Sequence, residues 1–282
     1  MKQLLCRQPI NKVGLHMQTK PMSRSALSRS VAPRSVRSVM PHSAMDSTPT
    51  NWILAALPSP QLQRLMPQMR PVTFNAGQVL YDEGQKLQSV YFLDRGLVSL
   101  VLNSTCGHSV EVGIVGREGI VGTYGIVGDV RSFSQAIVHI GGRGWRMPLE
   151  VFQQEYKNND RLHTLALQHL ELLHLQAAQT ALCNHLHCVE ERLCRWLLLT
   201  RHCTQSDSLP FTQECIAQML GVRRSGVTVA AQQLQEQKLI RYTRGHIQIS
   251  DSAGLTKKAC PCYTVLHRRF SHFHDSSRQW QH

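Results

Sequence analysis

The sequence contains no apolar run long enough to cross a membrane. A spanning helix needs roughly 18 to 20 consecutive apolar residues, and the chain of 282 residues offers no such run. The apolar core of a secretory signal peptide is missing as well. We therefore expect a cytoplasmic protein without a membrane partner.

Signatures of common enzymes are also missing. The sequence has no Gly-x-Ser-x-Gly nucleophile motif, no phosphate-binding Walker loop and no His-Glu-x-x-His zinc motif. Its β-rich region lacks the closely spaced histidine pair that a metal-dependent β-barrel oxygenase needs. We therefore assign no catalytic residues.

The cysteines do not form a disulfide framework. Their number is odd and their spacing irregular, which is typical of proteins in a reducing compartment. They occupy positions 6, 106, 183, 188, 194, 203, 215, 260 and 262. Most are expected to be small buried side chains.

Acidic residues are scarce in the first 50 positions, where eight Lys and Arg accompany the single acid Asp46. This segment supplies +7 of the net charge of +13. Its Ser, Met and Pro content without an apolar period predicts a disordered basic extension over residues 1–50. For residues 1–45 we favour an extension that precedes a translation start near Met40 or Met45; a nonspecific DNA-binding arm and a targeting signal are the alternatives.

Short β-rich runs separated by glycines follow, from residue 72 to about residue 149. Examples are residues 90–93 and 97–102, which stand on either side of Gly96. Many short strands at this spacing predict an antiparallel sandwich or barrel with a small cavity.

A helical period takes over from Asp160 to about His187, with leucines and alanines on two neighbouring stripes. A helix that is apolar on two stripes needs two partners, and we expect its own β-domain and the same helix of a second copy. Burial within one protomer is the alternative. The predicted dimerisation residues are Leu165, Leu170, Leu172, Leu173 and Ala177.

Residues 212–237 have the spacing of a helix-turn-helix. Ala217 falls where two short helices would cross, and Gly221 can adopt the positive φ that closes the turn. Thr212 is placed to cap the first helix. An ordinary pair of helices with a solvated basic face is the alternative.

A hairpin pattern follows, because residues 239–242 and 246–249 alternate apolar and polar side chains around Thr243-Arg244-Gly245. The unit is therefore predicted to be a winged helix-turn-helix that binds double-stranded DNA, with Arg241 also on or beside the wing. The predicted DNA-binding residues are Thr212, Gln213, Arg223, Arg224, Ser225, Thr228, Arg244 and His246.

The order of these parts resembles the Crp/Fnr family of bacterial transcription regulators. The resemblance covers roughly residues 52–270, and its carriers are residues 74–84, 90–96 and 189–198 together with the helix-turn-helix. It implies an α+β chain: an N-terminal cyclic-nucleotide-binding-like β-roll (jelly roll), a long central dimerisation helix and a C-terminal winged helix-turn-helix. It further implies a homodimer on a two-fold symmetric operator, with RNA polymerase as a partner.

The predicted domains are the extension (1–50), the sensor β-roll (51–155), the dimerisation helix (156–187), the DNA-binding domain (188–255) and a C-terminal tail (256–282). The effector pocket implied by the resemblance comprises Gly116, Glu118, Gly119, Arg131, Ser134 and Gln135. Cyclic-AMP-binding relatives carry an Arg-Ser or Arg-Thr pair where this chain has Ser134-Gln135, and Arg131 is offset by three residues. Cyclic AMP is therefore not expected to be the effector, and no cofactor is assigned.

A redox- or metal-responsive regulator is the second hypothesis. Cys183 and His187 share a helical face and Cys188 is adjacent, but no second pair has the usual zinc-site spacing. Only Cys6 precedes Cys106, so the thiolate set of the iron-sulfur relatives is missing. We therefore assign no metal ligands. A β-barrel enzyme with an accessory DNA-binding tail is the alternative from another class; the operator, the effector and the direction of regulation stay open.

Overall fold

The computed structural model describes residues 48–105, 109–127 and 131–278. Apart from its last three residues, the basic extension predicted over residues 1–50 lies outside this range, as do Cys6 and Cys106. All described elements belong to one compact unit, Ser43–His282. Among the described residues, no helix combines the length and apolarity needed to span a membrane.

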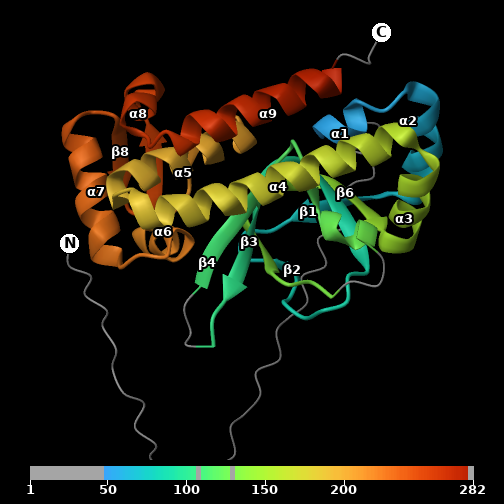
Figure 1. The fold of residues 1–282 in the computed structure, drawn as a ribbon, viewed down its shortest axis with the longest axis horizontal. Coiled ribbons are helices and arrows are strands. Elements are labelled where there is room, and N and C mark those ends of the chain that lie inside the picture. Colours follow the sequence, from blue (N-terminus) through green and yellow to red (C-terminus); the bar gives the residue numbers. More distant parts are fainter. Residues whose placement is uncertain (1–47, 106–108, 128–130, 279–282) are drawn as a thin grey trace, which may run out of the picture. The chain divides into compact units, whose positions relative to one another are not determined.

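Six antiparallel strands form the β-domain that the glycine-separated runs predicted (Figure 1). The main path runs β1-β6-β3-β4, with β2 paired to β6 and β5 paired to β3. The strands are β1 (Arg70–Phe74), β2 (Val79–Tyr81), β3 (Ser89–Asn103), β4 (Ser109–Val115), β5 (Ile120–Val121) and β6 (Gln135–Pro148). The expected α+β architecture is thereby confirmed for this half of the chain.

The sequence predicted separate strands at residues 90–93 and 97–102, but the structure joins them into the single strand β3. Gly96 lies inside it with φ of +114°, where the pairing of β3 with β6 shifts register. A Cβ on Gly142 of β6 would collide with the carbonyl oxygen of Arg95. The glycines therefore permit bulges that bend two long strands, where the sequence pattern had indicated turns.

Several short helices belong to the β-domain. Asn51 positions the first of them: its side chain caps α1 (Trp52–Ala55) and also donates to the carbonyl oxygens of Leu93 and Gly119. The others on this domain are α2 (Ser59–Leu65), the 3-10 helices Met66–Gln68 and Thr123–Val127, and α3 (Leu149–Asn158).

The long helix expected after residue 160 is α4 (Asp160–Leu186), which Asn159 caps by accepting from two backbone N–H groups. The side chain of Gln176 pairs with the backbone of Ile114 in β4. Its Oε1 accepts from the Ile114 N–H (3.0 Å), and its Nε2 donates to the Ile114 carbonyl (3.2 Å). α4 is thus fixed along the edge of the sheet.

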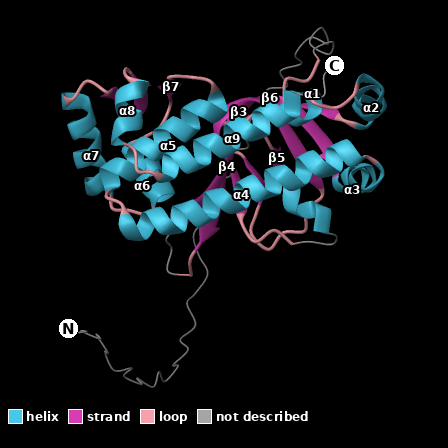
Figure 2. Ribbon diagram, turned by 45° about the horizontal axis from the view of Figure 1, so that its top comes forward, coloured by secondary structure: helices cyan, strands magenta, loops and turns pink. Residues whose placement is uncertain are grey.

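The segment expected to be a tail forms a further long helix, α9 (Cys262–Arg278), preceded by α8 (Ser252–Lys258). Figure 1 and Figure 2 both show α9 beside α4 and α5 (Val189–Thr204). Leu266, Phe270 and Phe273 of α9 are buried. These side chains cover a flank of α4 within the same chain.

This packing buries several of the predicted dimerisation residues within the protomer. Leu165, Leu172 and Leu173 are at most 3% exposed, because the β-domain and α9 already cover them. Leu170 and Ala177 are half-buried. The face of α4 left uncovered instead carries Leu167, His174, Ala178, Ala181 and Leu182.

The remaining elements form the winged helix-turn-helix that the sequence predicted. Strands β7 and β8 flank β9 in a three-stranded sheet. The elements are β7 (Ser208–Leu209), α6 (Gln213–Leu220), α7 (Arg224–Glu236), β8 (Ile240–Thr243) and β9 (His246–Ile249).

Candidate nucleic-acid interface and effector cavity

The turn between α6 and α7 has the geometry that the sequence predicted. The Thr212 hydroxyl accepts from the Cys215 N–H at 3.1 Å and caps α6. Gly221 ends α6 with φ of +62°, and Ala217 is 3% exposed at the contact between the helices. The local sequence therefore fixes both helix ends and the close approach between them.

Three polar side chains stand exposed at the start of α7: Arg223, Arg224 and Ser225. Arg223 is the N-cap residue, and its side chain makes no capping hydrogen bond. The first N–H groups of a helix and two guanidinium groups both favour negatively charged oxygen atoms. This edge therefore has the chemistry for phosphate and base contacts.

Two other predicted DNA-binding residues are engaged within the protein. The Thr228 hydroxyl lies 2.7 Å from Oε1 of Gln213 and 3.1 Å from the Arg224 carbonyl oxygen. The backbone N–H of Gln213 donates to the Tyr242 hydroxyl at 3.2 Å. Thr228 and Gln213 therefore hold α7 and the wing against α6, as the Thr212 cap holds the start of α6.

The wing is a tight hairpin in which Thr243 pairs with His246. Its two turn residues, Arg244 and Gly245, have φ of +28° and +85°, as a two-residue turn between twisted strands requires. Arg244 is exposed at the tip, as is Arg241 on β8. His246 is 3.1 Å from the Ser208 hydroxyl, so its ring is held beside β7.

The predicted effector residues do not come together in one site. Glu118 is 1% exposed, and its carboxylate accepts from the Gly116 N–H at 2.8 Å. A Cβ on Gly119 would meet the His169 ring of α4, and a Cβ on Gly116 would meet Cys203 of α5. These three residues therefore form a packed junction between β4 and two helices. Burial raises the pKa of Glu118 to about 7.

Arg131, Ser134 and Gln135 lie apart from that junction. Arg131 donates to the Gly84 carbonyl at 3.1 Å, and Gln135 donates to the Asp82 carboxylate at 2.5 Å. Both side chains therefore fasten the loop after β2. Ser134 is buried, and its backbone forms two hydrogen bonds with the Ser132 hydroxyl, which donates to the Ser134 carbonyl and accepts from the Ser134 N–H.

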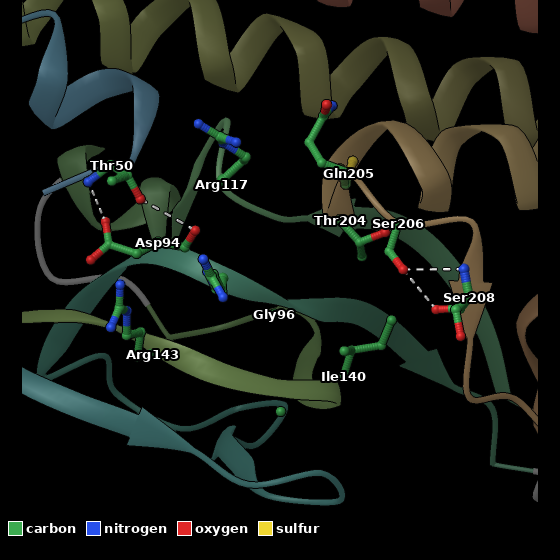
Figure 3. Close-up of a pocket in the computed structure, with 13 residues that line it drawn as sticks. Thr50, Asp94, Gly96, Arg117, Ile140, Arg143, Thr204, Gln205, Ser206 and Ser208 are labelled. Atoms are coloured by element: carbon green, nitrogen blue, oxygen red, sulfur yellow. Dashed lines mark hydrogen bonds between the residues drawn. The ribbon is translucent and has the colours of Figure 1, made fainter.

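A cavity of about 570 Å³ lies between the β-domain and the start of the DNA-binding domain (Figure 3). Asp94 sits at one end and accepts from the backbone N–H groups of Thr50 and Asn51 and from the Trp145 indole. The residues that line the cavity are Thr50, Asp94, Arg95, Gly96, Arg117, Ile140, Gly141, Arg143, Cys203, Thr204, Gln205, Ser206 and Ser208. None of the six predicted effector residues is among them.

Three guanidinium groups, those of Arg95, Arg117 and Arg143, give this cavity a positive character. Asp94 is already satisfied by its three donors, and no ion pair joins these arginines to an acid within the described residues. The cavity therefore has donors available for an anionic ligand.

Sequence reasoning missed this cavity although residues 94–96 were part of the family resemblance. The lining residues come from β3, β6 and the connection from α5 to β7, which are far apart in the chain. An arginine-rich cavity of this kind exists only after long-range strand pairing.

The structure also separates the residues of the redox or metal hypothesis. Cys188 is exposed and caps α5, with its N–H donating to the Glu191 carboxylate at 3.0 Å. Cys183 and His187 instead approach Cys260 and Cys262, which the sequence had not connected with them.

Two family models match the chain. A cyclic nucleotide-binding domain matches residues 71–159, and a Crp-like helix-turn-helix domain matches residues 191–258. A search of curated proteins gives no match.

Solved structures with the same fold cover about two thirds of the chain. FixK2 from Bradyrhizobium japonicum is 14% identical, with a TM-score of 0.59 over 68% of this chain and 98% of that one. A CRP/FNR-family transcriptional regulator from Thermus thermophilus is 23% identical, with a TM-score of 0.53 over 67% and 98%. The c-di-GMP-responsive global regulator CLP from Xanthomonas campestris is 14% identical, with a TM-score of 0.55 over 68% and 99%.

The β-domain and the winged helix-turn-helix thus each match their own family model, in the order that the fold shows. The chain belongs to the Crp/Fnr family of DNA-binding transcription regulators.

Proposed function

We propose that the chain regulates transcription as a homodimer on a two-fold symmetric operator, with α7 of each protomer in the major groove. The observation that carries this proposal is the exposed start of α7, where Arg223, Arg224 and Ser225 surround the first N–H groups of the helix. Arg224 is assigned to a base edge, and Arg223 and Arg244 are assigned to phosphates.

For the dimer, we assign the uncovered face of α4 in place of the leucines buried inside the protomer. Leu167 is 42% exposed and Leu182 is 45% exposed. Ala178 and Ala181, which lie between them in the sequence of α4, are exposed as well. Small and apolar side chains at this spacing suit a close contact with an identical helix. Leu170 and Ala177 lie at the margin of this face.

The proposed division of labour follows the predicted domains, with one change. Residues 51–155 sense the effector, residues 156–187 mediate dimerisation and residues 188–255 read DNA. The segment over residues 256–282 joins the folded body, because α9 packs against α4 and α5. RNA polymerase is the proposed partner for the transcriptional effect.

The arginine-lined cavity is the proposed effector site. An anion bound there would contact both the β-domain and the connection from α5 to β7, so its binding would act on the two halves together. The structurally similar regulator CLP is responsive to c-di-GMP, an anion, which supports searching among anionic effectors.

Selection from a random pool of DNA duplexes by the full-length protein tests the DNA-binding proposal. We expect a two-fold symmetric consensus, with half-sites about 10 base pairs apart from centre to centre. The Arg223→Ala, Arg224→Ala double variant should enrich no consensus. An Arg70→Ala, Arg268→Ala variant removes the same charge from exposed positions elsewhere and should select the original sequence. Failure to enrich any sequence with the unmodified protein would contradict the proposal.

A further inference from the structure

Four potential metal-binding side chains converge where the central helix ends. Cys183 lies in the last turn of α4 and His187 follows that helix directly, while Cys260 and Cys262 flank Pro261 at the start of α9. One ligand atom from each of the four residues lies within 4.8 Å of every other. The three cysteines are at most 3% exposed and form a small cluster apart from the main core.

The separations fit a single tetrahedral ion. The Sγ atoms of Cys183 and Cys260 are 3.5 Å apart, and Sγ of Cys262 is 3.8 Å from Nδ1 of His187. Around a tetrahedral Zn²⁺ with Zn–S bonds of about 2.3 Å and Zn–N bonds of about 2.0 Å, neighbouring ligand atoms lie roughly 3.5 to 3.8 Å apart. Both separations lie within about 0.3 Å of these values, and all four ligand atoms lie within 4.8 Å of one another, so small side-chain movements would complete a tetrahedral site.

Two buried arginines provide complementary charge. Arg192 is 6% exposed and Arg195 is 5% exposed, and the Nε atom of each is buried without a hydrogen-bond partner. Three thiolates and one neutral imidazole around a divalent ion carry a net charge of −1, which these guanidiniums would offset.

We propose that Cys183, His187, Cys260 and Cys262 bind one Zn²⁺ ion. Three sulfur ligands and one nitrogen ligand are a common donor set of structural zinc sites. An iron-sulfur cluster would place several atoms between the ligands and separate them further than the structure does. As each Zn–S bond forms, the thiol loses its proton to solvent, so no oxidant or reductant is needed.

The position of the site gives the ion a structural consequence. His187 lies between the last residue of α4, Leu186, and the first residue of α5, Val189. The ion would therefore tie the connection between the central helix and the DNA-binding domain to the start of α9. This proposal does not depend on which DNA sequence the protein reads.

Metal analysis of the full-length protein, purified under reducing conditions without chelator and then supplied with ZnSO₄, is the direct test. After removal of free metal, about one zinc per chain is expected. Cys183→Ser, Cys260→Ser and Cys262→Ser should each reduce the bound zinc several-fold. Cys188→Ser is the matched control, because Cys188 is adjacent in sequence, exposed and outside the cluster, and it should keep its zinc.

X-ray absorption at the zinc edge tests the same assignment on the unmutated protein, so it does not depend on the variants folding. Three sulfur neighbours and one nitrogen neighbour are expected. The proposal is overturned if the unmutated protein takes up no zinc, if the neighbours are mainly oxygen, or if a reduced sample shows a Cys183–Cys260 disulfide. Retention of zinc by all three cysteine variants would also overturn it.

Discussion

The indole N–H of Trp196 donates a hydrogen bond to the carboxylate of Glu111 at 2.7 Å, and this bond joins α5 to β4. The Ser99 hydroxyl donates to the other oxygen of the same carboxylate. Glu111 is 7% exposed, and burial raises its pKa to about 7. A titratable group therefore stands between the β-domain and the first helix of the DNA-binding domain.

The pH dependence of stability should reveal this carboxylate. Because its pKa in the folded state lies above its ordinary value of 4.5, this carboxyl group is more protonated in the folded protein than in the unfolded chain between pH 4.5 and pH 7. Its contribution to stability is present below pH 4.5 and is lost as pH rises toward 7. In denaturant unfolding, the free energy of unfolding of Glu111→Gln, relative to that of the unmodified protein, should rise by about 1 to 3 kcal/mol between pH 4.5 and pH 7.

His169 and His202 act in the opposite direction, since burial lowers the pKa of His169 to about 3 and of His202 to about 4. Their contributions are lost as pH falls below 6.5. Both proteins contain these histidines, so the histidine contribution cancels when their free energies of unfolding are subtracted at each pH. A difference that stays constant from pH 4.5 to pH 7 would contradict a raised pKa for Glu111.

Arg224→Ala and Arg223→Ala should differ in kind. Loss of a bidentate base contact costs about 1 to 3 kcal/mol of binding free energy and relaxes the sequence preference at one base pair. Loss of a phosphate contact weakens binding to all sequences alike, and the dependence of the logarithm of the binding constant on the logarithm of salt concentration falls by about one ion. Binding to single-base operator variants at several salt concentrations distinguishes the two. Reversed behaviour would exchange their roles, and no effect from either would remove α7 as the reading helix.

Dimerisation should depend on the uncovered face of α4. A Leu167→Glu, Ala178→Glu variant should sediment as a monomer that binds operator DNA weakly, because it places charge on both sides of the proposed contact. Leu173→Ala is a useful comparison, because this buried side chain should cost about 2 to 5 kcal/mol of stability without changing the association state. A double variant that still sediments as a dimer would show that the contact lies elsewhere.

Cyclic AMP should not bind with micromolar affinity, because Arg131 is exposed and fastened to the loop at Gly84. Calorimetric titration of the full-length protein measures this directly. Micromolar binding that Arg131→Ala abolishes would show that Arg131 replaces the arginine of the cyclic-AMP-binding relatives in spite of its offset. Binding that Arg117→Ala or Arg143→Ala abolishes would instead place the nucleotide in the arginine-lined cavity.

The helix α9 should contribute strongly to stability. Phe270 is fully buried, with its ring centroid 5.1 Å from that of His202 in α5, so Phe270→Ala should lower the free energy of unfolding by about 3 to 5 kcal/mol. Val265 of the same helix is 45% exposed, and Val265→Ala should change stability by about 0.5 kcal/mol or less. If Phe270→Ala and Val265→Ala had equally small effects on thermal or denaturant unfolding, α9 would not unfold cooperatively with the rest of the protein.

The helix-turn-helix could be predicted because its determinants are local. Thr212 caps a helix that begins one residue later, and Gly221 closes a turn within the same short segment. The wing could be predicted for the same reason, although the alternation of apolar and polar residues did not reveal that Arg244 adopts a positive φ as Gly245 does. These features depend on neighbours in sequence.

Features that depend on distant neighbours were missed. The cavity arginines come together through the pairing of β3 with β6, and the two halves of the cysteine–histidine cluster are more than 70 residues apart. One usable indication was overlooked: Leu266, Phe270 and Phe273 have the spacing of an amphipathic helix. Recognising α9 would have supplied the second partner for α4 within the chain and changed the predicted dimer face.

The pairing of Gln176 with Ile114 also bears on how this protein avoids self-association through its sheet. β4 is an edge strand, and an edge with free N–H and C=O groups can recruit a strand from another molecule. The amide of Gln176 presents one acceptor and one donor to Ile114, so a helix side chain occupies the position that an incoming backbone would take. The central helix therefore shields the sheet from uncontrolled growth at this point.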